Sequence, residues 1–327
     1  MKGGKILSNK KRACILKPAI KCKNKKTLKN NNISKILVGS NANKKSKKEM
    51  NMNKTIKKLK KSKKWSKTFS NLCDPPDYNT ALSLDKDLSK CFKVIKDKQS
   101  TYDSSAKMLV GEYGGITLKE YFDNKFKNKN NLNKKFYDSM KDVSNVLYGL
   151  KVLSDNNISH FDIKYDNIVY DDKLLKIIDF GLSNKINNVK YFKDIGYREF
   201  NGKRLYFWYP LEFIFYNNTF DISDIKGRKF YDTFSDIYDI LNFNEKQDYK
   251  IVAKEYKNMI KKLDTYSFGI MMIILFMKND LIKYIDKNDM IKDFFNLFKR
   301  MCEPLYKKRI SITEAYNYHN KLINKYS

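Results

Sequence analysis

Two short polar motifs constrain this chain more than any other feature. Residues 160–167 read His-Phe-Asp-Ile-Lys-Tyr-Asp-Asn, and Asp179-Phe-Gly181 follows twelve residues later. Phosphoryl transfer needs one carboxylate that orients the attacking hydroxyl, and two oxygen ligands that hold Mg²⁺ against the nucleotide phosphates. Asp162 is a candidate for the first task, and Asn167 and Asp179 are candidates for the second. The spacing therefore predicts a phosphoryl-transfer site.

Apolar runs flank the first motif and lead into the second. Residues 168–170 follow the loop and residues 174–178 run directly into Asp179, so we expect two short strands around the loop. Together these features resemble the H-R-D-L-x-x-x-N catalytic loop and the D-F-G metal loop of the eukaryotic-type protein kinases. Lys164, two residues after Asp162, is then expected to contact the γ-phosphate and favours serine or threonine as the acceptor.

The resemblance implies a fold and two ligands. We expect an α+β, bilobal protein-kinase-like fold, with a small β-rich lobe over residues 1–112 and a larger, mainly helical lobe over residues 113–327. ATP and Mg²⁺ are expected between the lobes. Asn167 and Asp179 would hold the metal.

One lysine and one glutamate match the pair that positions the α- and β-phosphates in this family. Lys35 is the centre of a plausible strand over residues 32–38, and Glu49 is the only acidic residue among the first 70. Met52 and Ile56 recur at helical spacing beyond it. A carboxylate on the inward face of a lysine-rich helix indicates a paired partner, and we expect Lys35 to be that partner.

The segment that should cover the phosphates departs from the family. The family has G-x-G-x-x-G-x-V, whereas residues 7–15 read Leu-Ser-Asn-Lys-Lys-Arg-Ala-Cys-Ile without a glycine. Leu7 and Ile15 are the expected contacts to the nucleotide here, and the side chains of residues 10–12 are an alternative cradle for the phosphates. Residues 17–22, Lys-Pro-Ala-Ile-Lys-Cys, resemble a segment in kinases of large DNA viruses. That resemblance implies a viral protein in the host cytoplasm or the virion.

Residues 107–118 resemble the strand and hinge that bind adenine through backbone groups. Glu112 and Tyr113 are the expected hinge residues, and the following pair of glycines suits a chain crossover. Gly111 falls at the back of the adenine pocket, where the family usually has a larger residue. We therefore expect extra volume beside Gly111.

Further landmarks follow in the family's order. Glu212, in Tyr-Pro-Leu-Glu, is expected to pair with Arg309, and Asp264 opens an apolar helix and is expected to brace the catalytic loop. Residues 213–263 form a long insert with helical spacing of apolar residues. Phe161 replaces the arginine with which a phosphorylated activation loop usually pairs, and residues 184–209 contain no Ser or Thr. We expect activity without phosphorylation of this segment.

The charge is concentrated near the N-terminus. Residues 1–70 carry 24 basic side chains and one acidic side chain, and the net charge of the chain is +31. Only six of the 67 basic residues are Arg, as an AT-rich coding sequence would produce, so we interpret most of this charge as solvated surface. The alternative is a non-specific, salt-sensitive attraction to nucleic acid or anionic surfaces.

The number and spacing of the cysteines and histidines argue against several kinds of site. The five cysteines form no C-x-x-C pair, so we expect an intracellular protein with neither a zinc module nor a disulfide framework. The chain has only two histidines, so a histidine-based zinc site or catalytic triad is hard to build. We see no apolar leader, and the longest strongly apolar run, residues 268–277, is about half of the roughly 20 residues that a spanning helix needs.

Three functions remain open. The first is an ATP-dependent serine/threonine protein kinase that acts on a protein substrate. The second is a catalytically weak pseudokinase that serves as a scaffold, which the missing glycines suggest. The third is a small-molecule kinase of the aminoglycoside-phosphotransferase type, which shares an H-x-D-x-x-x-x-N loop. We favour the first because five polar catalytic positions are retained, namely Lys35, Glu49, Asp162, Asn167 and Asp179.

Overall fold

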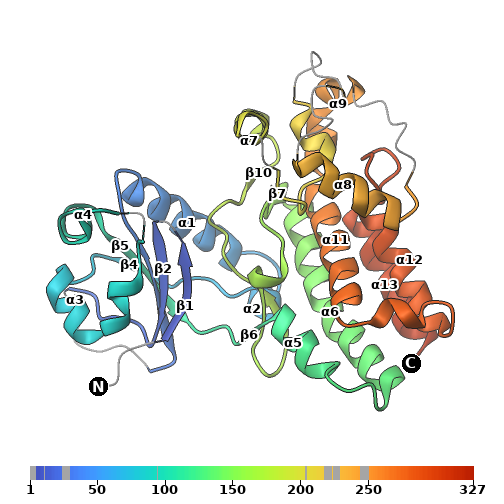
Figure 1. The fold of residues 1–327 in the computed structure, drawn as a ribbon, viewed down its shortest axis with the longest axis horizontal. Coiled ribbons are helices and arrows are strands. Elements are labelled where there is room, and N and C mark those ends of the chain that lie inside the picture. Colours follow the sequence, from blue (N-terminus) through green and yellow to red (C-terminus); the bar gives the residue numbers. More distant parts are fainter. Residues whose placement is uncertain are drawn as a thin grey trace. The chain divides into compact units, whose positions relative to one another are not determined.

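The protein is described from a computed structural model. The structure describes residues 5–10, 12–23, 30–93, 95–202, 205–216, 223, 229–243 and 250–327. The chain forms two compact units, the first over residues 1–115 with 178–181, and the second over residues 116–177 and 182–327. The first unit is built around a β-sheet and the second is mainly helical (Figure 1). This is the α+β organisation expected from the sequence.

The first unit contains a five-stranded antiparallel sheet in the order β1-β2-β3-β5-β4. Its strands are β1 (Lys5–Lys10), β2 (Ala13–Lys17), β3 (Asn32–Leu37), β4 (Asn71–Cys73) and β5 (Lys107–Glu112). Its helices are α1 (Ala42–Lys57), α2 (Ser62–Trp65), α3 (Tyr78–Leu84), the 3-10 helix η1 (Lys86–Lys90) and α4 (Lys98–Ser105).

Apolar side chains alternate between the two faces of this sheet, as the period of two along a strand requires. On one face, Leu37 and Leu109 pack against Met50 of α1. On the other face, Ile36 and Met108 pack with side chains of the segment between β4 and β5. That segment contains α3, η1 and α4, and we call it the β4–β5 insert. The sheet is therefore covered on both faces (Figure 1).

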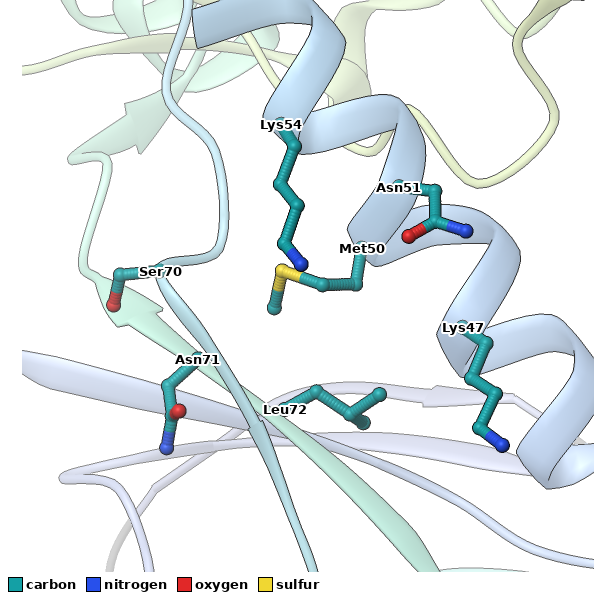
Figure 2. A pocket seen from close by; sticks show the side chains of 7 residues that line it. All are labelled: Lys47, Met50, Asn51, Lys54, Ser70, Asn71 and Leu72. Atoms are coloured by element: carbon teal, nitrogen blue, oxygen red, sulfur yellow. The ribbon is translucent and has the colours of Figure 1, made fainter.

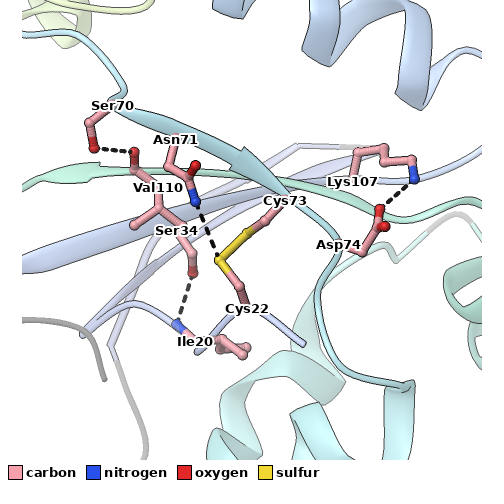
Figure 3. Close-up of a disulfide and its surroundings, with 9 residues drawn as sticks. All are labelled: Ile20, Cys22, Ser34, Ser70, Asn71, Cys73, Asp74, Lys107 and Val110. Atoms are coloured by element: carbon pink, nitrogen blue, oxygen red, sulfur yellow. Dashed lines mark hydrogen bonds and ion pairs between the residues drawn. A yellow bond between two sulfur atoms is a disulfide. The ribbon is translucent and has the colours of Figure 1, made fainter. Parts of the chain in front are cut away.

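The first unit contains two disulfides. Cys14 of β2 is bonded to Cys91, just after η1, which joins the β4–β5 insert to the sheet. Cys22, between β2 and β3, is bonded to Cys73 of β4 (Figure 3). Our expectation of a chain without a disulfide framework is wrong for these four residues. The partners are 77 and 51 residues apart, and adjacent strands and the β4–β5 insert bring them together, so no local spacing signals them. Cys302 is a buried free thiol.

The second unit places two small sheets beside a helical core. The strands are β6 (Ile116–Thr117), β7 (Ile158–Ser159), β8 (Ile168–Tyr170), β9 (Leu175–Ile177) and β10 (Asn184–Lys185), arranged as β6-β8-β9 and β10-β7. The 3-10 helices are η2 (Tyr165–Asn167), η3 (Leu211–Ile214) and η5 (Leu281–Tyr284). The α-helices are α5 (Leu118–Lys125), α6 (Leu132–Asp155), α7 (Val189–Asn201), α8 (Lys229–Ile240), α9 (Lys250–Lys254), α10 (Tyr256–Ile260), α11 (Leu263–Lys278), α12 (Asp289–Met301) and α13 (Ile312–Lys325).

The apolar helix expected from residue 264 onwards is α11, which is buried along nearly its whole length. It contacts α12 and α13, and α13 contacts α6, so these helices form one packed core. An all-round apolar helix of this kind needs protein on every side. In the long insert, α8 buries Phe234, whereas Ile222 and Ile225, which we also expected in a helix, lie outside the described residues. Among the described residues, no helix is long and apolar enough to cross a membrane.

Candidate active site

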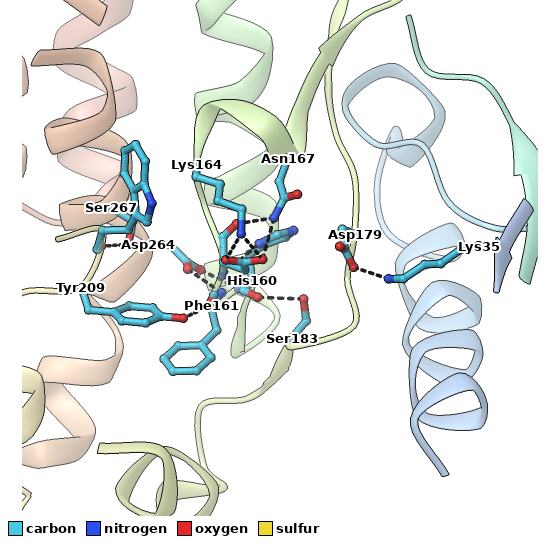
Figure 4. Close-up of polar contacts among 12 residues, drawn as sticks. Lys35, His160, Phe161, Lys164, Asn167, Asp179, Ser183, Tyr209, Asp264 and Ser267 are labelled. Atoms are coloured by element: carbon cyan, nitrogen blue, oxygen red, sulfur yellow. Dashed lines mark hydrogen bonds and ion pairs between the residues drawn. The ribbon is translucent and has the colours of Figure 1, made fainter. Parts of the chain in front are cut away.

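A buried ion pair joins β3 to α1 in the first unit. The Lys35 Nζ lies 2.9 Å from each carboxylate oxygen of Glu49. Asp179 adds a second carboxylate, with its Oδ1 2.8 Å from the same Nζ (Figure 4). Burial alone would lower the pKa of Lys35, but Asp179 and Glu49 outweigh it and raise that pKa, so Lys35 stays charged. Three residues predicted from the sequence therefore meet around one ammonium group.

The backbone after Ile177 is shaped for this contact. Asp179 has a φ of 60°, in the left-handed region that non-glycine residues seldom occupy. A Cβ at Gly181 would lie 3.0 Å from Glu49 Oε2 and 3.3 Å from Asp179 Oδ1. A side chain here would crowd the two carboxylates, so glycine suits this position of the Asp-Phe-Gly motif.

The catalytic loop of the second unit gathers three polar side chains around Asp162. The Lys164 Nζ donates to both carboxylate oxygens of Asp162, at 2.7 and 2.8 Å. The Asn167 amide donates to the Asp162 backbone oxygen and to Oδ2, each at 2.8 Å (Figure 4). The Asp162 carboxylate is thus held by two side chains from its own loop. A carboxylate in a fixed orientation is what a hydroxyl substrate requires.

Asp264 supports the backbone of this loop. Its carboxylate accepts hydrogen bonds from the backbone N–H of His160 at 2.7 Å and of Phe161 at 2.8 Å, and from Ser159 Oγ at 3.2 Å. Burial raises the pKa of Asp264, while the electrostatic interaction with His160 and these hydrogen bonds oppose that rise. Ser183 adds a hydrogen bond to the His160 carbonyl oxygen at 3.0 Å, which sequence reasoning missed. Hydrogen bonds from Asp264 and Ser183 therefore hold the loop backbone.

The β1–β2 hairpin occupies the place of the glycine-rich segment. Ile15 pairs with Lys35 across β2 and β3, so both side chains lie on the same face of the sheet. Leu7 lies at an irregularity of β1 and is 38% exposed. The Arg12 side chain lies against Gly39, near the beginning of α1. Of the alternative phosphate cradle, Lys11 and the side chain of Lys10 lie outside the described residues.

The predicted hinge follows β5. Glu112 ends this strand and its side chain is 65% exposed, with an ion pair to Lys67 at 3.2 Å. The backbone N–H of Tyr113 donates to the Asn31 carbonyl oxygen at 2.8 Å, and the Lys17 ammonium lies 3.4 Å from the centre of its ring. These contacts join the hinge to the ends of β2 and β3.

The space beside Gly111 is filled by a residue that the sequence did not indicate. A Cβ at Gly111 would lie 3.1 Å from Phe69 Cδ1 and 3.2 Å from Phe69 Cα. Our expectation of extra volume there is wrong because Phe69, just before β4, supplies the missing bulk. The Phe69 ring also lies 5.9 Å from the Lys35 Nζ. No local motif marks Phe69, since its contact depends on the pairing of β4 with β5.

A hollow of 420 Å³ lies between α1 and β4 (Figure 2). Lys47, Met50 and Lys54 of α1 line it together with Asn71 and Leu72 of β4. None of the predicted site residues lines this hollow. We assign it no part in the reaction.

The pair expected between Glu212 and Arg309 is present and fully buried in the second unit. Arg309 Nη2 lies 2.6 Å from Glu212 Oε1, and the backbone N–H of Tyr306 donates to Glu212 Oε2 at 2.8 Å. Burial raises the pKa of Glu212, and Arg309 opposes that rise. The pair fixes η3 to the segment before α13 and takes no direct part in the chemistry.

The predicted metal ligands have suitable chemistry. Mg²⁺ prefers oxygen ligands and keeps several from water or substrate, so a protein that binds Mg²⁺ through a nucleotide needs few of its own. Asn167 uses its amide nitrogen on Asp162, so its oxygen is the atom suited to a metal, and Asp179 is a carboxylate. Among the described residues, no cluster of three or more His, Cys, Asp or Glu could hold a metal by itself. The donors fit a nucleotide-bound Mg²⁺ better than a structural metal.

Comparison with known proteins places this geometry in a family. Residues 22–216, more than half of the chain, match the family model described as protein kinase domain. A stretch of 68 residues is 38% identical to calcium-dependent protein kinase 4 of Plasmodium berghei and 37% identical to that of Plasmodium falciparum. Each match covers 19% of this chain and 13% of the relative's own length.

Proposed function

The chain belongs to the protein kinase family, and from that premise we propose that it transfers the γ-phosphate of Mg-ATP to serine or threonine hydroxyls of a protein substrate. The observation that carries the proposal is the Asp162 carboxylate, held by Lys164 and Asn167 on a loop whose backbone N–H groups are bonded to Asp264. An ordered carboxylate on a rigid loop is suited to orient a hydroxyl and take its proton.

Each remaining polar residue has a role in this proposal. Lys35, kept charged by Asp179 and Glu49, would bind the α- and β-phosphates. Lys164 would give up part of its contact with Asp162 to bind the γ-phosphate. Asn167 and Asp179 would supply the protein's oxygen ligands to Mg²⁺. The metal, when bound, neutralises the negative charge of the phosphates. The choice of serine or threonine rests on Lys164 and on the family resemblance.

The test is phosphate transfer by the purified protein. Generic protein substrates are incubated with Mg²⁺ and γ-labelled ATP, followed by phosphoamino acid analysis, with Asp162→Ala as the blank. We expect label on serine or threonine with wild-type protein, and loss of about 10³-fold or more in the variant, because base and orientation are both removed. Label on tyrosine would contradict the proposed transfer to serine or threonine. ATP binding without transfer would favour a pseudokinase scaffold, and transfer to an aminoglycoside alone would favour a small-molecule kinase.

The basic N-terminal third supports a second proposal, about the partners of the protein. Exposed lysines of α1, such as Lys44, Lys45 and Lys47, are not balanced by acidic residues in that helix, whose only acid is the buried Glu49. We propose that this surface attracts acidic substrates or other anionic partners without sequence specificity. Binding of an acidic polymer that persists unchanged at high salt would contradict this, because such attraction is screened.

A further inference from the structure

The β4–β5 insert is attached to the β1–β2 hairpin by two adjacent residues. Asn9 of β1 donates through Nδ2 to the Lys90 carbonyl oxygen at 2.7 Å, and Cys14 of β2 is bonded to Cys91. One strand is held by a hydrogen bond and the other by a covalent bond. Both anchors lie at the end of η1, which directly contacts β1.

The insert is itself firmly placed on the sheet. Leu88 and Phe92, on either side of the anchors, are buried in the cluster that contains Ile36 and Met108 of the central strands. At its other end, Ser105 Oγ accepts a hydrogen bond from the backbone N–H of Gly39 at 2.7 Å. The anchors therefore connect the hairpin to a packed layer, and they can fix its position.

The hairpin has an unusual need for such an anchor. A segment that covers phosphates usually relies on glycines, which let the backbone approach the ligand and adapt to it. Residues 7–15 contain no glycine. A hairpin that cannot adapt has to be held in the binding position beforehand, and preorganisation of this kind favours binding because less freedom is lost when the ligand arrives.

We propose that the β4–β5 insert positions the β1–β2 hairpin for nucleotide binding through the Cys14–Cys91 disulfide and the hydrogen bond from Asn9 to Lys90. The proposal rests on the proposed function, in which this hairpin meets the phosphates. Asn9, Cys14 and Cys91 are positioning residues that act through the hairpin. With both anchors in place the hairpin is held and the nucleotide is bound tightly; without them the hairpin is released and affinity falls.

The first experiment establishes the bond and measures nucleotide affinity. Peptide mapping of the full chain without reductant should recover the peptide pair that contains Cys14 and Cys91. Calorimetric titration with Mg-ATP then compares the wild type with Cys14→Ser/Cys91→Ser. We expect the double variant to bind about tenfold more weakly, as loss of preorganisation implies.

The second disulfide provides the matched control. Cys22→Ser/Cys73→Ser removes a cross-link from the same unit, but one that joins β4 to the segment before β3 and includes no residue of β1 or β2. It should lower thermal stability and keep the affinity for Mg-ATP. Equal weakening by both double variants would show a general loss of stability and overturn the positioning role.

A further variant covers the case in which the double variant fails to fold. Asn9→Ala removes only the hydrogen bond to Lys90 from an exposed position, and Asn9→Gln retains an amide donor. Asn9→Ala should raise the KM for ATP with little change in kcat, and Asn9→Gln should recover part of the loss. An unchanged KM in Asn9→Ala, or unchanged affinity in Cys14→Ser/Cys91→Ser, would overturn the inference. Absence of nucleotide binding by the wild type would instead contradict the proposed function.

Discussion

The Tyr209 hydroxyl donates a hydrogen bond to the backbone carbonyl oxygen of Phe161 at 3.0 Å, and the two rings stack with their centroids 5.0 Å apart. Phe161 immediately precedes Asp162 and has a φ of 65°, in the left-handed region. Phe192 of α7 meets the Phe161 ring edge to face at 5.0 Å. An apolar cluster thus holds the segment before the Asp162 carboxylate. In kinases with an arginine at the position of Phe161, a pair between that arginine and a phosphate holds this segment instead.

This cluster predicts that activity does not depend on phosphorylation of residues 184–209. Burial raises the pKa of Tyr209 well above its ordinary value, so its hydroxyl stays a neutral donor within the cluster. Phosphatase-treated protein should keep its rate of phosphate transfer, measured beside a mock-treated sample and a mass-spectrometric map of the segment. A rate that collapses with loss of a mapped phosphotyrosine would contradict the prediction.

The contact between Phe69 and Gly111 predicts which residue limits the size of the adenine group. Phe69→Ala should open space beside Gly111. The variant should then bind ATP analogues with a bulky adenine substituent at least about tenfold more tightly than the wild type does, because the substituent can occupy the space of the Phe69 ring. Competition binding against ATP would measure this. Leu72→Ala, a substitution in the adjacent β4, is the control that should leave the preference unchanged. Equal rejection of the analogues by wild type and Phe69→Ala would place the adenine elsewhere.

Part of the site could be predicted from the sequence, and part of it could not. The catalytic loop, the Asp-Phe-Gly motif and the Lys35–Glu49 pair were predictable because their chemistry requires particular residue types at short or regular spacing. Phe69 was not, since it acts through a neighbouring strand and no rule of spacing relates it to Gly111. The disulfides were missed for the same reason, because Cys22 and Cys73 meet only when the sheet has formed, and Cys14 and Cys91 only when the β4–β5 insert has packed on it.

The Glu212–Arg309 pair predicts a large loss of stability when one partner is removed. Both side chains are fully buried, so Glu212→Ala leaves the Arg309 charge without its carboxylate in the protein interior. Breaking a pair of this kind costs about 3–5 kcal/mol of unfolding free energy. Urea unfolding would measure the change. Asp138→Ala, which breaks an exposed pair with Lys134 on α6, should cost no more than about 0.5 kcal/mol. Similar losses in both variants would contradict the burial argument.

His319 predicts how stability depends on pH. Burial lowers its pKa from 6.5 to about 3, and its Nδ1 lies 3.1 Å from Ser144 Oγ. Below pH 6.5 the unfolded chain binds a proton that the folded protein does not, so this contribution to stability is lost as the pH falls from 6.5 towards 3.

Between pH 7 and pH 5 the loss from His319 should be about 2 kcal/mol. His319→Asn, which keeps a neutral polar side chain, should be less stable at pH 7 but should lose less stability on acidification. Unfolding curves at several pH values would give the difference between the two proteins. Parallel pH profiles would show that His319 is not the group responsible.

The Lys35–Asp179 contact has a consequence for how the gene could be divided. Residues 178–181 belong to the first unit, although the chain on either side of them belongs to the second. The polypeptide therefore passes between the units three times, and a fragment that ends at residue 115 would lack Asp179. Such a fragment would carry a buried lysine with one of its two carboxylates missing. Neither unit is a module that could be exchanged by a single crossover, and recombination or truncation would have to preserve the chain as a whole.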